Sequence, residues 1–205
     1  MTSWILLVGI PLLVCAGCGS LSRTFMNASW RDRWQHPEVV VHSLALRPGN
    51  QVADLGAGGG YFTFRLADAV GPTGKVYAVE IDANFFPHIQ RKVKEQDVSN
   101  VRTVLGKPGD PTLPAADVDV AFLHDVLHHV EDKQGYLRQV VRYLTPAARL
   151  AIVEFNPATS PHKDDPRLQV TKSEMTAWMA ALGFAPAEDV SLFADKWYVV
   201  YARKQ

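Results

Sequence analysis

An acidic residue followed by a run of glycines is the first feature of this sequence that suggests chemistry. Asp54 lies near the end of a short apolar stretch, and residues 56–60 read Gly-Ala-Gly-Gly-Gly. Glycine has no Cβ atom, so the backbone of such a turn can approach a ligand closely and adopt positive φ angles without strain. A helix that begins directly after the turn offers free N–H groups and the positive end of its dipole. The pattern predicts a loop for a nucleotide-shaped cofactor, with the acid facing a cationic group.

The loop differs at one position from the glycine fingerprint of dinucleotide-binding enzymes. That fingerprint, G-x-G-x-x-G, requires a third glycine at the position where this chain, counted from Gly56, has Tyr61. The third glycine allows the helix to pack closely on the strand, which a tyrosine side chain opposes. The sequence therefore disfavours a dehydrogenase.

The order Asp-x-Gly-x-Gly at residues 54–58 resembles motif I of the class I S-adenosylmethionine (SAM) methyltransferases. Segments 75–82, 119–130 and 150–155 resemble the second, fourth and fifth strand regions of the same family. Gly-Tyr-Phe after motif I and Leu-His-His-Val after the fourth strand are most similar to its small-molecule branch, which includes quinone-biosynthesis C-methyltransferases.

The resemblance implies both a fold and an activity. The fold is α/β, a Rossmann-like, doubly wound, seven-stranded and mostly parallel sheet with an antiparallel C-terminal edge hairpin. The activity is transfer of a methyl group from SAM to a small-molecule acceptor, at an oxygen or a carbon atom. The alternative is a membrane-anchored, non-catalytic protein that keeps the methyltransferase fold, because a fold does not guarantee its chemistry.

The resemblance also implies which residues of the glycine loop bind the cofactor. Asp54 would hold the amino group of the methionine part, directly or through water. Gly56 and Gly58 would let the methionine part pass over the loop, and Ala57 and Tyr61 belong to the same predicted contact surface.

The adenosine part is expected to lie farther along the same edge of the sheet. Glu80 follows the glycines by roughly 20 residues, the distance at which a carboxylate accepts hydrogen bonds from ribose hydroxyls. By resemblance, Ile81 would pack on adenine. An acid of the loop 106–114 would face the adenine amino group; Lys107 or Asp110 aligns with it, and we predict Asp110.

Catalysis of methyl transfer depends first on an in-line nucleophile, because the sulfonium is already activated. A hydroxyl or carbon acceptor also needs a base at the rim of the site. We predict that the catalytic residues, at the ends of the fourth and fifth strands, are His124, Asp125 and Glu154. His162 follows in the next loop, whereas His128 and His129 are expected to cap or pack, because they open a helix. No metal site is predicted.

The elements that position these residues alternate along the chain. Strands are predicted over residues 52–55, 75–80, 101–105, 119–124, 150–154, 186–193 and 197–202, the last two joined as a hairpin through 194–196. Helices are predicted over residues 31–46, 61–70, 83–94 and 132–144, and from the capping box of Thr171 and Glu174 to about Gly183.

Composition limits the classes of protein and of partner. With 205 residues and 47% hydrophobic content, the chain suits one domain with a full-sized core. The net charge is zero, so the chain lacks the excess of Lys and Arg with which proteins bind the phosphates of nucleic acid. Both cysteines, Cys15 and Cys18, lie near the amino terminus. A disulfide framework is therefore excluded, and arsenite methylation, which needs several cysteines, is disfavoured.

The amino terminus carries an uncharged apolar segment, residues 4–19, which has the length of a signal peptide. The sequence Cys-Ala-Gly-Cys at its end resembles a bacterial lipobox with Cys18 as acceptor. The first basic residues follow this segment, which favours instead an uncleaved anchor with the domain inside. We predict a signal or anchor at 1–19, a linker at 20–30 and the methyltransferase domain at 31–205, membrane-associated unless the start codon is misassigned. The side of the membrane and the oligomeric state stay open.

Overall fold

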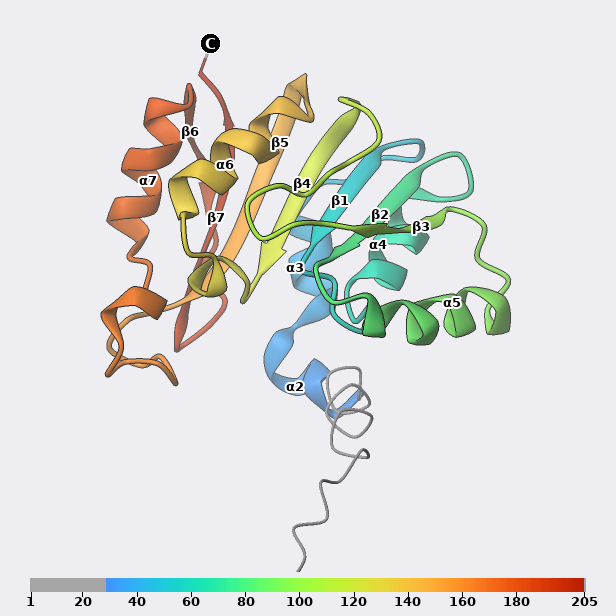
Figure 1. Cartoon of the computed structure of the whole chain (residues 1–205), viewed down its shortest axis with the longest axis horizontal. Coiled ribbons are helices and arrows are strands. Elements are labelled where there is room, and N and C mark those ends of the chain that lie inside the picture. Colours follow the sequence, from blue (N-terminus) through green and yellow to red (C-terminus); the bar gives the residue numbers. More distant parts are fainter. Residues whose placement is uncertain (1–28, 205) are drawn as a thin grey trace, which may run out of the picture.

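The computed structural model describes residues 29–204. It contains a seven-stranded sheet with helices on both faces (Figure 1). The strands are β1 (Gln51–Leu55), β2 (Lys75–Glu80), β3 (Val101–Leu105), β4 (Val118–His124), β5 (Leu144–Phe155), β6 (Phe184–Asp189) and β7 (Lys196–Arg203). The helices are α2 (Asp32–Gln35), α3 (Pro37–Ser43), α4 (Thr63–Val70), α5 (Phe86–Glu95), α6 (Lys133–Arg142) and α7 (Lys172–Ala181). Short 3-10 turns are η1 (Ser29–Arg31), η2 (Ala83–Phe85), η3 (Leu127–His129) and η4 (Pro166–Leu168).

The strand order is β3-β2-β1-β4-β5-β7-β6. Strands β1 to β5 are parallel, and β7 pairs antiparallel with both β5 and β6. The structure confirms the predicted fold class, including the antiparallel edge at the carboxyl terminus.

Both faces of the central strands are buried, as expected for a parallel sheet covered by helices. Residues such as Val52 and Val120 pack on the face that carries α3 and α4. Their neighbours, such as Ala53 and Ala121, pack on the opposite face with α6 and α7. Alternating side chains therefore place a separate apolar layer on each side of the sheet.

The strand order reverses at β1, which lies between β2 and β4. In open α/β sheets, ligands bind outside the carboxyl ends of the strands at this point. Gly56 follows β1 and Asp125 follows β4, so the fold brings the glycine loop and the predicted catalytic segment to one edge.

The single helix predicted over 31–46 is two helices in the structure. His36 separates α2 from α3 and has a left-handed backbone, with φ of 44°. The physical reason is Pro37, whose ring disfavours the helical conformation of the residue before it.

Two predicted boundaries near the carboxyl half are also wrong. Strand β5 begins at Leu144, a residue predicted to be helical, and α6 ends at Arg142. Strand β6 covers Phe184–Asp189, so residues 190–193 are a connection and not part of a hairpin strand. A register shift between Pro186 and Glu188 accompanies this early end of pairing, as is common in edge strands.

Among residues 29–204, no helix has the length and apolar character needed to cross a membrane. The predicted signal or anchor at 1–19 and most of the linker at 20–30 lie outside the described residues, so these remain predictions.

Candidate active site

The glycine loop has the backbone conformation that its sequence suggests. Gly56, Gly58 and Gly60 have φ angles of 75°, 54° and 83°. A Cβ atom on Gly56 would overlap the side chain of Val126. The N–H group of Gly56 donates to the carbonyl of Val79 over 2.9 Å, which fixes the loop against the end of β2. Position 56 therefore requires glycine for both its backbone angle and its close packing.

Asp54 lies inside the protein at the end of β1 and is only 4% exposed. Thr63 Oγ1 donates a hydrogen bond of 2.5 Å to its Oδ2 atom. Burial raises the pKa of Asp54 to about 7; the Thr63 bond opposes this shift and the charge of Glu80 adds to it. A cation bound next to this carboxyl group would favour its ionised form and could form an ion pair with it.

Glu80 lies at the end of β2, on the other side of the glycine loop. Its Oε1 accepts a 2.7 Å hydrogen bond from the N–H of Gly58, and Oε2 accepts one of 3.0 Å from Ile81. Burial raises the pKa of Glu80, although these backbone N–H groups oppose the shift. Each carboxylate oxygen can accept a second hydrogen bond, so the side chain is oriented and still able to bind hydroxyl groups.

Two hollows meet along this edge of the sheet. The larger hollow, of about 550 Å³, is lined by Glu80, Ile81, Lys107 and His129 among others. The smaller hollow, of about 120 Å³, is lined by residues that include Asp54, Gly58, Tyr61 and His124. Gly56 and Asp125 line both. The combined hollow passes directly over the glycine loop and is of the size that small-molecule sites usually have.

His124 and Asp125 form a polar pair at the end of β4. The Nδ1 atom of His124 lies 3.3 Å from Oδ2 of Asp125, and the Lys196 ammonium lies 2.5 Å from the same oxygen. Burial by itself raises the pKa of Asp125, but His124 and Lys196 together hold it well below its usual range. Asp125 is therefore ionised at neutral pH.

Two atoms of this pair are buried without a hydrogen-bond partner among the described residues, His124 Nε2 and Asp125 Oδ1. Asp125 also has a left-handed backbone, with φ of 57°. Unsatisfied buried polar atoms and such backbone angles are frequent at functional sites. The predicted catalytic residues His124 and Asp125 thus lie together beside the smaller hollow.

Comparison with known proteins gives the family. Residues 46–200 match the family described as "Methyltransferase domain". The chain belongs to this methyltransferase family. The match confirms the predicted methyltransferase class.

Curated relatives of this methyltransferase domain are longer proteins. It is 32% identical over 154 residues to an arsenite methyltransferase of Halobacterium salinarum, covering 74% of this chain and 38% of that protein. It is 31% identical over 141 residues to the ubiquinone/menaquinone biosynthesis C-methyltransferase UbiE of Pseudomonas syringae pv. syringae, covering 68% of this chain and 54% of that protein. The chain thus spans about two fifths to about half of the length of these relatives.

Solved structures show the same fold. A SAM-dependent methyltransferase from Aquifex aeolicus has a TM-score of 0.80 at 22% identity, covering 90% of this chain and 98% of that one. The [4+2]-cyclase SpnF has a TM-score of 0.68 at 16% identity, covering 82% of this chain and 80% of that one.

Two site predictions have a different setting in the structure of the methyltransferase domain. Asp110 is outside the lining of the larger hollow, because its Oδ1 accepts hydrogen bonds from the Thr112 N–H (2.7 Å) and the Tyr143 hydroxyl (2.9 Å). Glu154 is 1% exposed and contacts His128, with Oε1 2.6 Å from its Nδ1 atom. Neither residue is among those that line the two hollows, and their predicted roles stay predictions.

The attachment of the first helix to the glycine loop was not predicted from the sequence. The Tyr61 hydroxyl donates to Asp32 over 2.5 Å, and Arg65 forms an ion pair of 2.9 Å with the same carboxylate. The Arg31 guanidinium lies over the Tyr61 ring, 4.3 Å from its centroid, and also lines the smaller hollow. Tyr61, in place of the third glycine, therefore joins α2 to the cofactor loop.

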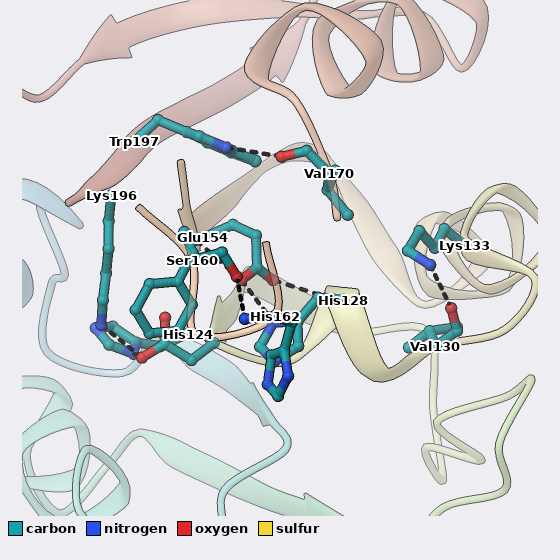
Figure 2. A network of polar contacts seen from close by, with 12 residues as sticks. His124, His128, Val130, Lys133, Glu154, Ser160, His162, Val170, Lys196 and Trp197 are labelled. Atoms are coloured by element: carbon teal, nitrogen blue, oxygen red, sulfur yellow. Dashed lines mark hydrogen bonds and ion pairs between the residues drawn. The ribbon is translucent and has the colours of Figure 1, made fainter. Parts of the chain in front are cut away.

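Lys196 is the second residue that sequence reasoning missed. Its ammonium is buried beside Asp125 and lies 4.6, 5.5 and 5.8 Å from the ring centroids of Phe155, Phe193 and Trp34. In Figure 2 the side chain of Lys196 extends toward His124. No local pattern signals this arrangement, because Lys196 lies 71 residues from Asp125 in the sequence.

Proposed function

We propose that this methyltransferase domain binds SAM across the two hollows and transfers its methyl group to an oxygen or carbon atom of a small molecule. The observation that carries the proposal is the pair of oriented carboxylates on either side of the glycine loop. Asp54 suits the ammonium of the methionine part, and Glu80 suits the ribose hydroxyls. Ile81, 62% exposed in the larger hollow, offers an apolar surface to adenine.

The reaction then proceeds beside the smaller hollow. Bound SAM would supply the activated methyl group: an in-line nucleophile would take the methyl carbon, the carbon–sulfur bond would break, and S-adenosylhomocysteine would leave as the neutral thioether. We propose that His124, which lines the smaller hollow, accepts the proton that the acceptor loses. Asp125, ionised beside Lys196, orients the imidazole through Nδ1 and stabilises its protonated form.

Aromatic side chains near this site support an apolar or aromatic acceptor. Trp34 is 44% exposed although it is large and apolar, and Trp30, 52% exposed, lies 5.8 Å from it between ring centroids. Phe193 lies 6.0 Å from the His124 ring. Arsenite is a poorer candidate despite the related arsenite methyltransferase, because residues 46–200 contain no cysteine.

Calorimetric titration of the full-length protein with SAM tests the cofactor. We expect saturable binding of SAM and of S-adenosylhomocysteine. If neither ligand binds at millimolar concentration, the proposal is refuted. Methyl-labelled SAM with a panel of phenols, quinols and other small acceptors then tests the reaction. His124→Asn should lower turnover and leave SAM affinity unchanged, whereas the control Asp68→Asn, at an exposed position of α4, should change neither.

A non-catalytic protein with the same fold is the second candidate, and the similarity to a [4+2]-cyclase shows that this fold serves other reactions. Binding of SAM without formation of S-adenosylhomocysteine with any acceptor would favour it.

We further propose that residues 4–19 attach the protein to a membrane, on the ground of their apolar, uncharged composition. The full-length protein should fractionate with membranes, and a variant without this segment should not. Labelling of Cys18 by a lipid precursor would indicate export. Protection of the domain from protease in spheroplasts, without labelling, would indicate an anchor with the domain inside.

A further inference from the structure

Three histidines from two separate segments meet at the edge of the larger hollow. His128 and His129 belong to η3, and His162 comes from the connection between β5 and η4. One nitrogen of each ring lies within 4.8 Å of a nitrogen of each of the others. The ring centroid of His128 lies 4.0 Å from that of His129 and 5.3 Å from that of His162. Figure 2 shows His128 and His162 next to each other.

Glu154 orients the innermost of these rings. Its Oε1 lies 2.6 Å from Nδ1 of His128, and its Oε2 accepts a 3.1 Å hydrogen bond from the backbone N–H of the same residue. With Nδ1–H donated to the carboxylate, the lone pair of His128 lies on Nε2. A carboxylate that binds the far nitrogen of a histidine in this way is the usual support of a metal-ligating imidazole.

The segment that carries His162 is held against η3. Ser160 Oγ accepts a 3.0 Å hydrogen bond from the His162 N–H. The Lys133 ammonium donates to the carbonyl oxygens of Val130 (2.9 Å) and Arg167 (2.8 Å), which ties the residues after η3 to η4. The approach of His162 to the other two histidines is thus supported by polar contacts on both sides of the segment.

We infer that His128, His129 and His162 form a binding site for one divalent transition-metal ion, with Zn²⁺ as the best-suited ion. Imidazole ligands favour zinc and its neighbours over Mg²⁺ or Ca²⁺, which prefer oxygen ligands. Tetrahedral coordination with Zn–N distances of about 2.0–2.1 Å places ligand nitrogens about 3.3 Å apart, so nitrogens now within 4.8 Å of one another would approach by at most about 1.5 Å on binding. Three protein ligands leave a fourth position open toward the larger hollow, which His129 lines.

Metal titration of the full-length protein tests this site without any use of enzymatic activity. After treatment with a chelator and dialysis, the protein is titrated with Zn²⁺, and separately with Co²⁺ to record the visible absorption of a tetrahedral site. We expect one equivalent of Zn²⁺ to bind with a dissociation constant in the micromolar range or below. Less than a tenth of an equivalent, or binding only at millimolar metal, would overturn the inference.

Variants locate the metal. His162→Ala changes a half-buried residue of a surface segment and should weaken Zn²⁺ binding at least 100-fold, while the control His42→Ala, at an exposed position of α3, should not change it. Glu154→Gln should weaken binding about 10- to 100-fold, because the neutral amide supports the His128 ring less well. His129→Asn, at an exposed position, provides a second ligand variant, and an unchanged melting temperature of the metal-free protein verifies the fold of each variant. Zn²⁺ affinity that survives in both His162→Ala and His129→Asn would place the metal elsewhere and refute this site.

Discussion

The pH dependence of SAM binding is a direct test of the part that Asp54 plays. Burial raises its pKa from 3.8 to about 7, against the Thr63 hydrogen bond and with a smaller increase from Glu80. About half of the unliganded molecules therefore carry a protonated Asp54 at pH 7. Binding of a ligand ammonium selects the ionised form, so the proton must leave.

We expect SAM affinity to fall as the pH drops below 7. The ionised fraction of Asp54 decreases from about one half at pH 7 to about 3% at pH 5.5, so the apparent Kd should rise about sixteen-fold. The α-amino group of the ligand, with a pKa of about 7.7–8.0, stays protonated over this interval. Asp54→Asn removes a charge-assisted hydrogen bond of about 1.5–3 kcal/mol and should weaken binding at pH 7 about 10- to 100-fold. The affinities of the two proteins should converge toward pH 5.5.

Isothermal titration calorimetry in buffers of different ionisation enthalpy measures both the Kd and the protons released. Wild type should release about half a proton at pH 7 through Asp54, and Asp54→Asn should release none from this position. Glu80, Asp125 and His129 also line the hollows and are present in both proteins, so the ratio of the two affinities reports mainly on Asp54. A ratio of wild-type to variant affinity that stays constant between pH 5.5 and 7 would refute the reasoning.

The same titration affects the stability of the unliganded protein. Between pH 3.8 and about 7 the folded state binds more protons at Asp54 than the unfolded state does, so the free energy of unfolding falls as the pH rises. Over the whole interval this contribution amounts to roughly 4 kcal/mol. In urea denaturation without SAM, Asp54→Asn should therefore gain stability relative to wild type as the pH increases through this window.

Three further substitutions have defined outcomes. Glu80→Gln should weaken SAM binding about 10- to 100-fold in calorimetry, since an amide cannot accept hydrogen bonds at both atoms, and equal affinity would contradict the ribose assignment. Gly56→Ala should lower the melting temperature and abolish SAM binding, because position 56 has a φ of 75° and the added Cβ atom overlaps the Val126 side chain. The double variant Gly56→Ala/Val126→Ala should recover only the part of the melting temperature that the overlap costs. Lys196→Met should destabilise the fold by about 1–3 kcal/mol in denaturant unfolding because it leaves the half-buried Asp125 carboxylate with His124 as its remaining charged partner. A smaller loss in Lys196→Met/Asp125→Asn would identify that carboxylate as the cause.

Local sequence determined the cofactor loop and the class of fold. Glycine at position 56 is dictated by a backbone angle and a close contact, and such requirements leave a pattern readable over a few residues. The order of apolar strands and intervening helices likewise defined a doubly wound sheet before its strand order was known. The break at His36 was also readable, because Pro37 restricts the residue before it, but the hydrophobic spacing outweighed that signal in the prediction of one helix.

Tertiary structure alone decided which polar side chains meet. Lys196 reaches Asp125 because β7 pairs antiparallel with β5, which places Lys196 opposite Phe155 at the carboxyl end of β4 and β5. His162 meets His128 because the segment after β5 returns across η3. These contacts join residues far apart in the sequence, and their partners depend on strand order and register, which no local spacing encodes. The sequence by itself therefore determined the cofactor loop and the architecture, whereas the charge pairs and the histidine cluster around them exist only in the folded sheet.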